Sequence, residues 1–182
     1  MTRALLTFPL LGLLATTLAA ADLKSGPQPG EKVPGPFEPL NVNGEDAGRK
    51  QCLYCKHGDS PVAAVFARTA DDANLVKLLT ALDALTDKNQ KVEMGTFAIY
   101  LSDDAKLADK LKQQAEQAKY KQMVLAIDGA EGPAKYRIAK DADITVLLYK
   151  DRVVIANYAF EKGKLGEKDV ERIVAEAAKL AK

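Results

Sequence analysis

Two cysteines separated by two residues are the strongest candidates for chemistry in this sequence. Cys52 and Cys55 form a C-x-x-C motif, the spacing at which two thiols can cycle between a dithiol and a disulfide. Lys50, Lys56 and His57 flank the pair, and nearby positive charge favours the reactive thiolate over the thiol. We therefore predict thiol-disulfide exchange with Cys52 and Cys55 as the catalytic residues, the more exposed one attacking a substrate disulfide.

Two other interpretations of the motif stay open. A static disulfide would close a loop of only a few residues, so its entropic stabilisation would be small compared with that of a long-loop bridge. Cys52, Cys55 and His57 could act as ligands of a metal ion, but a closed zinc site needs a fourth ligand and none is evident. Haem attachment requires a histidine directly after the second cysteine, which His57 is not. We predict no metal, no other cofactor and a solvated His57.

The first residues have the features of a secretory signal peptide. A single charge, Arg3, precedes a mostly apolar stretch that contains Pro9 and ends in small residues at positions 19–21. The apolar core is shorter than the roughly 20 residues that a membrane-spanning helix needs. We expect residues 1–21 to be removed, leaving a secreted or periplasmic chain without membrane contact.

The charge balance and the expected compartment limit the partners. Without Arg3 the chain holds 25 basic and 25 acidic residues and is formally neutral. It lacks the one-sided positive charge that nucleic acids select, so we expect no nucleic-acid partner. An oxidising compartment makes a disulfide between the two cysteines the expected state. The motif predicts a protein disulfide as the substrate.

The chain after the signal peptide divides into an irregular segment and one folded unit. Five of the eight prolines lie between Pro27 and Pro39, and residues without a backbone N–H donor cannot enter the interior of a sheet. We predict a Pro/Gly-rich leader at residues 22–36 and a single domain at residues 37–182. An alternating pattern at residues 37–42 predicts an edge strand at the start of that domain.

Strand and helix patterns then alternate along the domain. Strands are predicted at residues 62–67, 96–101 and 123–127, followed by a hairpin of residues 144–149 and 153–158. Helices are predicted through residues 75–85 behind the capping Asp71 and Asp72, from Asp103 to Ala115, and over residues 168–180. This order predicts an α/β fold with a mixed central sheet flanked by helices.

Three segments carry a resemblance to a known family. Residues 126–128, 134–138 and 145–151 resemble the second half of thioredoxins, with Asp128 ending a strand, Tyr136 in a short helix and Thr145 leading the next strand. The extra helix and strand within residues 103–127 are similar to the insertion found in peroxiredoxins and thioredoxin-like secreted reductases. The resemblance implies a thioredoxin-like fold over residues 60–180.

The sequence departs from this family at the positions that usually do the chemistry. Thioredoxin-like oxidoreductases place the nucleophilic cysteine in the turn after the first central strand, but here residues 68–72 contain no sulfur. The family's cis-proline before the Thr-led strand is replaced by Ile144. Because the C-x-x-C precedes the strand 62–67, it should lie about 20 Å from the usual site. The alternative function is therefore a non-enzymatic binding module with a structural disulfide, and residues 68–72 are expected to be cap and surface residues.

Overall fold

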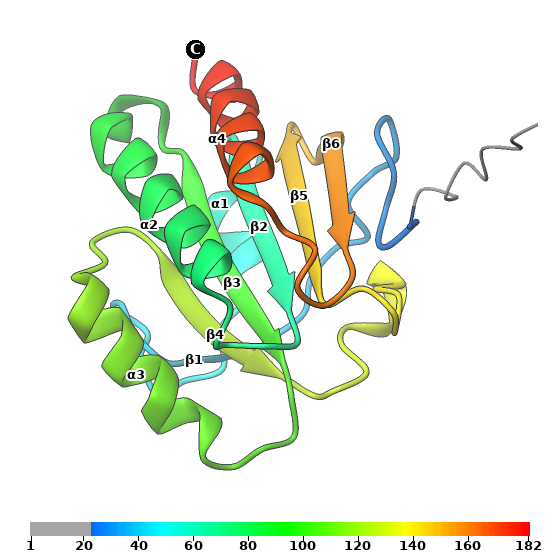
Figure 1. The fold of residues 1–182 in the computed structure, drawn as a ribbon. Coiled ribbons are helices and arrows are strands. Elements are labelled where there is room, and N and C mark those ends of the chain that lie inside the picture. The colour runs from blue at the N-terminus through cyan, green and yellow to red at the C-terminus, as the bar shows by residue number, and fades with distance from the viewer. Residues whose placement is uncertain (1–22) are drawn as a thin grey trace, which may run out of the picture.

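The computed structural model describes residues 23–182, so the predicted signal peptide lies outside the described residues. A six-stranded sheet forms the centre, in the order β1-β4-β3-β2-β5-β6 (Figure 1). The strands are β1 (Leu40–Asn41), β2 (Val62–Ala67), β3 (Gly95–Leu101), β4 (Val124–Asp128), β5 (Ile144–Lys150) and β6 (Val153–Phe160). Strands β2, β3 and β4 are parallel and the other pairs are antiparallel, so the sheet is mixed, as predicted.

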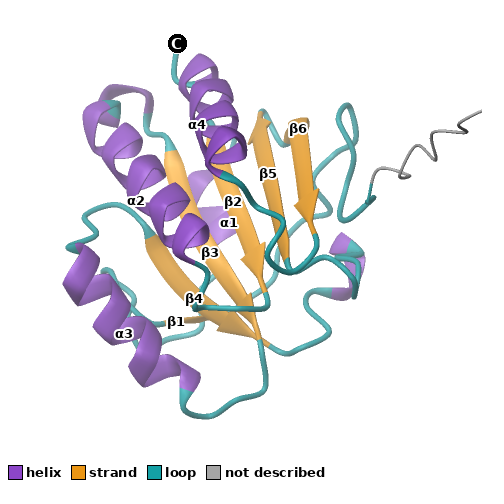
Figure 2. Cartoon of the chain, in the orientation of Figure 1, coloured by secondary structure: helices purple, strands orange, loops and turns teal. Residues whose placement is uncertain are grey.

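Helices cover both faces of this sheet. They are α1 (Leu53–His57), α2 (Ala73–Lys88), α3 (Leu107–Ala118) and α4 (Glu167–Leu180), with two short 3-10 helices, η1 (Gln90–Val92) and η2 (Ala134–Tyr136). The three longer helices α2, α3 and α4 pack on one face, and the short α1 packs on the other (Figure 2). The predicted fold class, a mixed central sheet flanked by helices, is confirmed.

Strand β2 divides its side chains between two cores. Ala63 and Val65 point into the core beneath α2 and α4, whereas Val62 and Phe66 point into the core beneath α1 and η2. All four are fully buried. Burial on both faces explains why this strand reads in the sequence as a continuous apolar run rather than as an alternating pattern.

The predicted cap and apolar stripe of the first long helix are confirmed. The carboxylate of Asp72 accepts hydrogen bonds from the backbone N–H groups of Asn74 at 2.8 Å and Leu75 at 2.9 Å, which satisfies two donors at the start of α2. Leu79 lies in the middle of the helix and is completely buried, together with its neighbours Leu75, Leu78 and Leu82.

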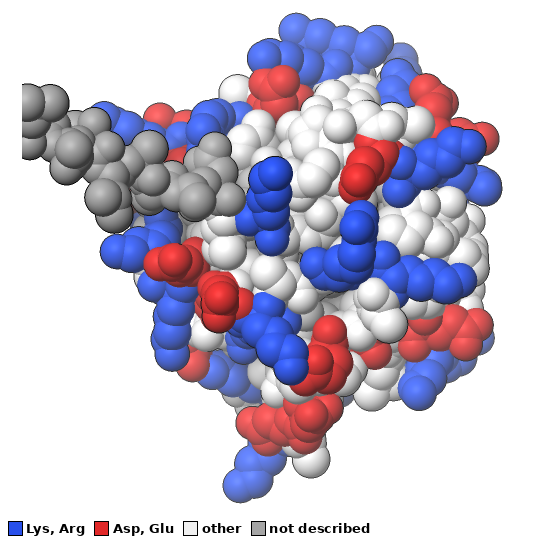
Figure 3. Space-filling view, turned by 90° about the vertical axis from the view of Figure 1, so that its right-hand side faces the viewer, with Lys and Arg blue, Asp and Glu red and all other residues white. Residues whose placement is uncertain are grey.

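The Pro/Gly-rich segment lies against strands β5 and β6, and it is not extended throughout, because the Glu31 N–H donates to the Gln28 carbonyl at 2.9 Å in a turn. The Ser25 and Thr145 hydroxyls are 2.7 Å apart, and the Asn157 amide donates to the Ser25 carbonyl at 2.7 Å. Tyr136 donates to the carbonyl of Gly35 at 2.8 Å. On the β6 side of the molecule, basic and acidic side chains are interspersed among uncharged residues (Figure 3). No helix within residues 23–182 has the length and apolar character needed to cross a membrane.

Candidate functional site

The C-x-x-C motif lies at the start of the short helix α1. Cys52 is its N-cap, and its Sγ accepts a hydrogen bond from the backbone N–H of Cys55 at 3.1 Å. The two sulfurs are joined in the predicted disulfide. Leu53 and Tyr54, between the cysteines, are buried in the core beneath α1, and Gly58 ends the helix with a φ of 55°. The motif is therefore presented on a helix anchored by the two residues that the cysteines enclose.

Tyr54 and the loop after α1 fix this helix to the hairpin of β5 and β6. The guanidinium of Arg152 lies 5.5 Å from the centre of the Tyr54 ring and pairs with Asp59 at 2.9 Å. Asp59 also accepts a backbone hydrogen bond from Asp151 at 2.9 Å. Tyr54 is thus a packing residue of the anchor, although its position between the cysteines gave no indication of this role.

Both cysteines lie at the amino end of the central strands. The loop that follows α1 leads directly into β2, where Val62 pairs with Gly95 of β3 and Tyr149 of β5. Parallel strands of open α/β sheets carry their ligand sites at the opposite, carboxyl end. The structure therefore places the motif on the side of the sheet that its position in the sequence indicated.

The two cysteines differ in exposure. Cys55 is exposed and Cys52 is half-buried. Cys55 borders an open surface hollow of about 490 Å³. The hollow is lined by Cys55, Lys56, His57, Gly58, Asp59, Ser60 and Glu93. Cys55 is therefore the more accessible of the two cysteines from solvent, and the hollow lies beside it.

His57 is not the solvated loop residue that we expected. Its half-buried ring stacks on Phe97, with the ring centres 6.1 Å apart and the planes at 10°. Burial, with a smaller contribution from the Lys56 charge, lowers the pKa of His57 to about 4. The imidazole is neutral at pH 7 and adds no positive charge near the cysteines.

The packed position of the His57 ring depends on a glycine that the sequence did not indicate as important. A Cβ atom at Gly95 would lie 2.4 Å from the His57 ring, far inside contact distance. Gly95 begins β3, and its N–H donates to the Pro61 carbonyl at 2.8 Å. A glycine at the start of an apolar run does not indicate that the His57 ring packs against it, so this contact could not be predicted from the sequence.

The lysines beside the motif supply less free charge than the sequence suggested. The Lys56 ammonium lies 3.5 Å from carboxylates of both Glu45 and Asp46. Lys50 is exposed to solvent, which weakens its influence on either sulfur. Within residues 23–182 no group of three His, Cys, Asp or Glu side chains is arranged to hold a metal ion.

Comparisons with known proteins find resemblance in fold. No family model and no curated protein matches the sequence. Peroxidoxin BcpB from Mycobacterium tuberculosis matches with a TM-score of 0.61 at 19% identity, covering 85% of this chain and 96% of that chain. The chain has a thioredoxin-like fold.

Two further structures show how widely the proteins with this fold differ. A secreted disulfide oxidoreductase of M. tuberculosis, homologous to E. coli DsbE, matches with a TM-score of 0.56 at 11% identity, covering 77% of this chain and 95% of that chain. ScoI of Arabidopsis thaliana, solved with copper bound, matches with a TM-score of 0.55 at 14% identity, covering 80% and 96%. The thioredoxin-like fold is shared among them, and the function must be argued from the site.

In this thioredoxin-like chain an arginine fills the turn where the family carries its cysteine. The Arg68 guanidinium donates to the carbonyls of Ala130 at 2.6 Å, Ala142 at 3.1 Å and Ala139 at 3.3 Å. Its backbone N–H donates to the Asp143 carbonyl at 2.8 Å. Arg68 therefore ties β2 to the segment that precedes β5. It is half-buried and has a structural role, so the expectation of a cap or surface residue was wrong for Arg68.

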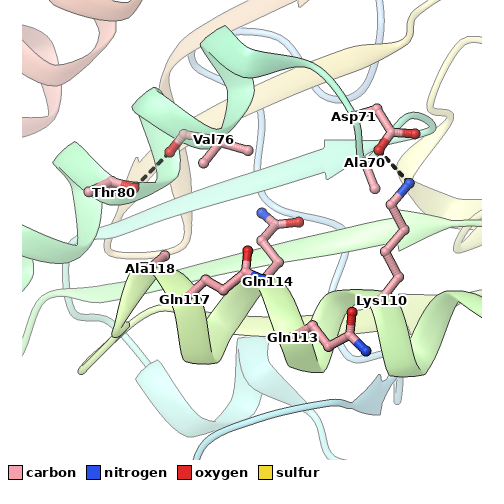
Figure 4. Close-up of a pocket in the computed structure, with 9 residues that line it drawn as sticks. All are labelled: Ala70, Asp71, Val76, Thr80, Lys110, Gln113, Gln114, Gln117 and Ala118. Atoms are coloured by element: carbon pink, nitrogen blue, oxygen red, sulfur yellow. Dashed lines mark hydrogen bonds and ion pairs between the residues drawn. The ribbon is translucent and has the colours of Figure 1, made fainter.

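Asp71 and Asp72 of that turn are a surface residue and a cap, as predicted, whereas Thr69 and Ala70 are half-buried. Asp72 caps α2, and the exposed Asp71 pairs with Lys110 of α3 beside a groove of about 530 Å³ between α2 and α3 (Figure 4). The groove is lined by Ala70, Asp71, Val76, Thr80, Lys110, Gln113, Gln114, Gln117 and Ala118. Ile144, at the family's proline position, pairs with Ala67 as an ordinary strand residue, and residues 23–182 contain no cis peptide bond.

Proposed function

We propose that this thioredoxin-fold protein carries out thiol-disulfide exchange at Cys52 and Cys55. The observation that carries the proposal is the pairing of an exposed Cys55 with a half-buried Cys52 in a disulfide at the protein surface. A more exposed and a less exposed cysteine suit exchange, because one cysteine must meet the substrate and the other must resolve the mixed disulfide.

The exchange consists of two displacements. In the reduced protein the Cys55 thiolate attacks one sulfur of a substrate disulfide, forming a mixed disulfide and releasing the first substrate thiolate, which takes up a proton. The Cys52 thiolate then attacks the Cys55 sulfur, releasing the second substrate thiol and leaving the Cys52–Cys55 disulfide. The substrate gains two electrons and the protein loses two, so a dithiol donor must reduce the pair before the next turnover.

The geometry around Cys52 suits the resolving step. Its sulfur already accepts the Cys55 N–H, and a hydrogen bond to a thiolate favours the charged, nucleophilic form. The two Cα atoms are 5.2 Å apart, so the resolving thiolate is held next to the sulfur it attacks.

A fixed bridge on a non-enzymatic binding module is the rival, and the reduction potential separates the two. Structural disulfides in exported proteins have potentials below about −300 mV, whereas pairs that cycle lie above this value. We expect the potential of the Cys52–Cys55 pair to lie above about −300 mV. We also expect the wild type to reduce insulin faster than the Cys52→Ser, Cys55→Ser double variant.

The single variants locate the roles of the two cysteines. Cys52→Ser should trap a mixed disulfide on Cys55, since the resolving thiol is missing. Cys55→Ser should lose exchange with protein substrates, since the remaining thiol is half-buried. Background-level insulin reduction by the wild type, together with a potential below about −300 mV, would reject exchange in favour of a structural disulfide.

The compartment belongs to the same proposal. The lone Arg3, the apolar stretch and the small residues at 19–21 support export and cleavage after Ala21. We propose an oxidising environment for the pair on this basis, with protein disulfides as substrates. N-terminal sequencing of the exported protein should begin at Asp22. A mature chain that still begins at Met1 would contradict the cleavage.

A further inference from the structure

We propose that Glu93 makes the site selective for disulfides flanked by positively charged groups. The inference rests on the proposed exchange at Cys55 and names the class of substrate that it favours. Glu93 and Cys55 line the same surface hollow, which is the space open to the groups on either side of a partner's sulfur. A charge fixed at this place acts on every substrate that reaches Cys55.

The position of Glu93 is held by its backbone. It follows η1 in the left-handed region, at a φ of 51°, and its N–H donates to the Gln90 carbonyl at 3.0 Å. The next residue, Met94, is buried, and Gly95 is tied to Pro61 at the start of β2. The exposed side chain of Glu93 is therefore carried by a turn anchored at both ends, beside the loop that bears the cysteines.

The other charges of the hollow are engaged elsewhere. Lys56 lies near two carboxylates outside the hollow, those of Glu45 and Asp46, and Asp59 pairs with Arg152 at 2.9 Å. Within residues 23–182, Glu93 makes no ion pair.

These pairings leave the hollow with a net negative charge. The lining holds one lysine, one aspartate and one glutamate, and the half-buried His57 is neutral at pH 7. A cationic group beside the attacked sulfur is attracted and an anionic one repelled. For exposed charges about 5 Å apart, each of these two effects changes the rate about three- to fivefold relative to a neutral group at low salt.

Small symmetric disulfides of different charge test this directly. The reduced Cys52→Ser variant keeps Cys55 and cannot resolve, so its thiolate attacks the probe, forms one mixed disulfide and releases one probe thiol. The probes are cystamine, which is cationic, bis(2-hydroxyethyl) disulfide, which is neutral, and 3,3′-dithiodipropionate, which is anionic. The rate of mixed-disulfide formation is followed by mass spectrometry, and a thermal midpoint confirms that each variant is folded.

The quantity to compare is the ratio of the cationic to the anionic rate. In the Cys52→Ser background, adding Glu93→Gln should lower this ratio about 10- to 25-fold, because the cationic probe loses its attraction and the anionic probe loses its repulsion. High salt should lower the ratio in the same direction without the second substitution. Glu161→Gln is the matched control, because Glu161 is an exposed carboxylate just after β6, at the other end of the sheet. It should leave the ratio unchanged.

The outcomes separate the selectivity from the exchange itself. If Cys55 reacts with all three probes at ratios that Glu93→Gln does not change, the selectivity is wrong and the exchange stands. If the folded protein reacts with none of them while the unfolded chain reacts with all, Cys55 is inaccessible, and both the exchange and the selectivity are wrong.

Discussion

The two ends of strand β2 carry opposite kinds of structure. At the amino end, a five-residue helix presents a disulfide whose exposed cysteine, Cys55, lies beside an open hollow. At the carboxyl end, Arg68 joins three backbone carbonyls and leaves no reactive group in the turn. The end of the strand that holds the catalytic cysteine in thioredoxin-like oxidoreductases therefore has a structural role here, and the disulfide lies at the other end.

This difference shows what the thioredoxin-like fold requires at each end. The segment before β5 leaves carbonyls that must find donors, and an arginine offers five N–H donors in one planar group. The amino end needs only a short connection between residue 52 and β2. Helix α1 forms this connection and is anchored by the buried side chains of Leu53 and Tyr54. The fold is kept while the site differs, as expected when function depends on residues placed on a shared scaffold.

The largest effect is expected at the carboxyl end. Arg68→Met removes the donors of three carbonyls in a partly buried place, and hydrogen bonds to a charged group are each worth about 1.5–3 kcal/mol before the carbonyls are rehydrated. We expect a loss of about 4 kcal/mol in the free energy of unfolding, measured by urea denaturation.

Arg68→Lys is the control for this substitution. A single ammonium cannot reproduce the planar arrangement, so most of the loss should remain. If Arg68→Met leaves the free energy of unfolding unchanged, the turn does not need its arginine. The structural role that we assign to the carboxyl end of β2 would then be wrong.

The next effect concerns the amino end of β2, where the protonation of His57 makes the stability of the protein depend on pH. The pKa of His57 in the folded protein is about 4, below the ordinary value of 6.5, so only the unfolded chain takes up a proton between these values. Stability is therefore lost as the pH falls through this window, by about 3 kcal/mol in total.

His57→Phe keeps the stack on Phe97 and removes the titration. Between pH 7 and pH 4 the wild type should lose about 3 kcal/mol more than this variant, while the carboxylates affect both proteins alike. If the wild type and His57→Phe lose stability in parallel as the pH falls, the pKa of His57 is not lowered in the folded protein.

The sequence predicted those parts of this comparison that depend on local patterns. The run from Val62 to Ala67, the leucine stripe of α2 and the hairpin of β5 and β6 follow from burial and periodicity, which are visible in short windows. The disulfide and its place before β2 followed from the order of residues along the chain.

The environment of the site could not be predicted in this way, because it is made by contacts between distant residues. His57 stands in a polar segment typical of a loop, yet Gly95 and Phe97 provide the surface that buries it. The carbonyl partners of Arg68 are likewise more than 60 residues away. A basic residue near a cysteine suggested positive charge, but the charge actually present depends on those distant partners.

The smallest effect concerns the packing of α1 on the sheet, where the His57 ring contacts Gly95. In Gly95→Ala the new methyl group would lie 2.4 Å from the His57 ring, so the ring must leave its place on Phe97 or the helix must shift. Overpacking of a well-packed site typically costs about 1–3 kcal/mol, and the lower entropy of the unfolded chain returns up to about 1 kcal/mol. We expect a net loss of about 1–2 kcal/mol in urea denaturation.

Gly129→Ala is the matched control for Gly95→Ala, because a methyl group there would meet only a side-chain oxygen of Asp103 at 3.6 Å, an ordinary contact. The displaced ring should also change the chemistry at the amino end. His57 and Cys55 border the same hollow, so the rate at which Cys55 reacts with a neutral disulfide should change in Gly95→Ala and not in Gly129→Ala. If stability falls and this rate stays constant, α1 keeps the cysteines in place without the His57 stack, and Leu53 and Tyr54 alone anchor the site.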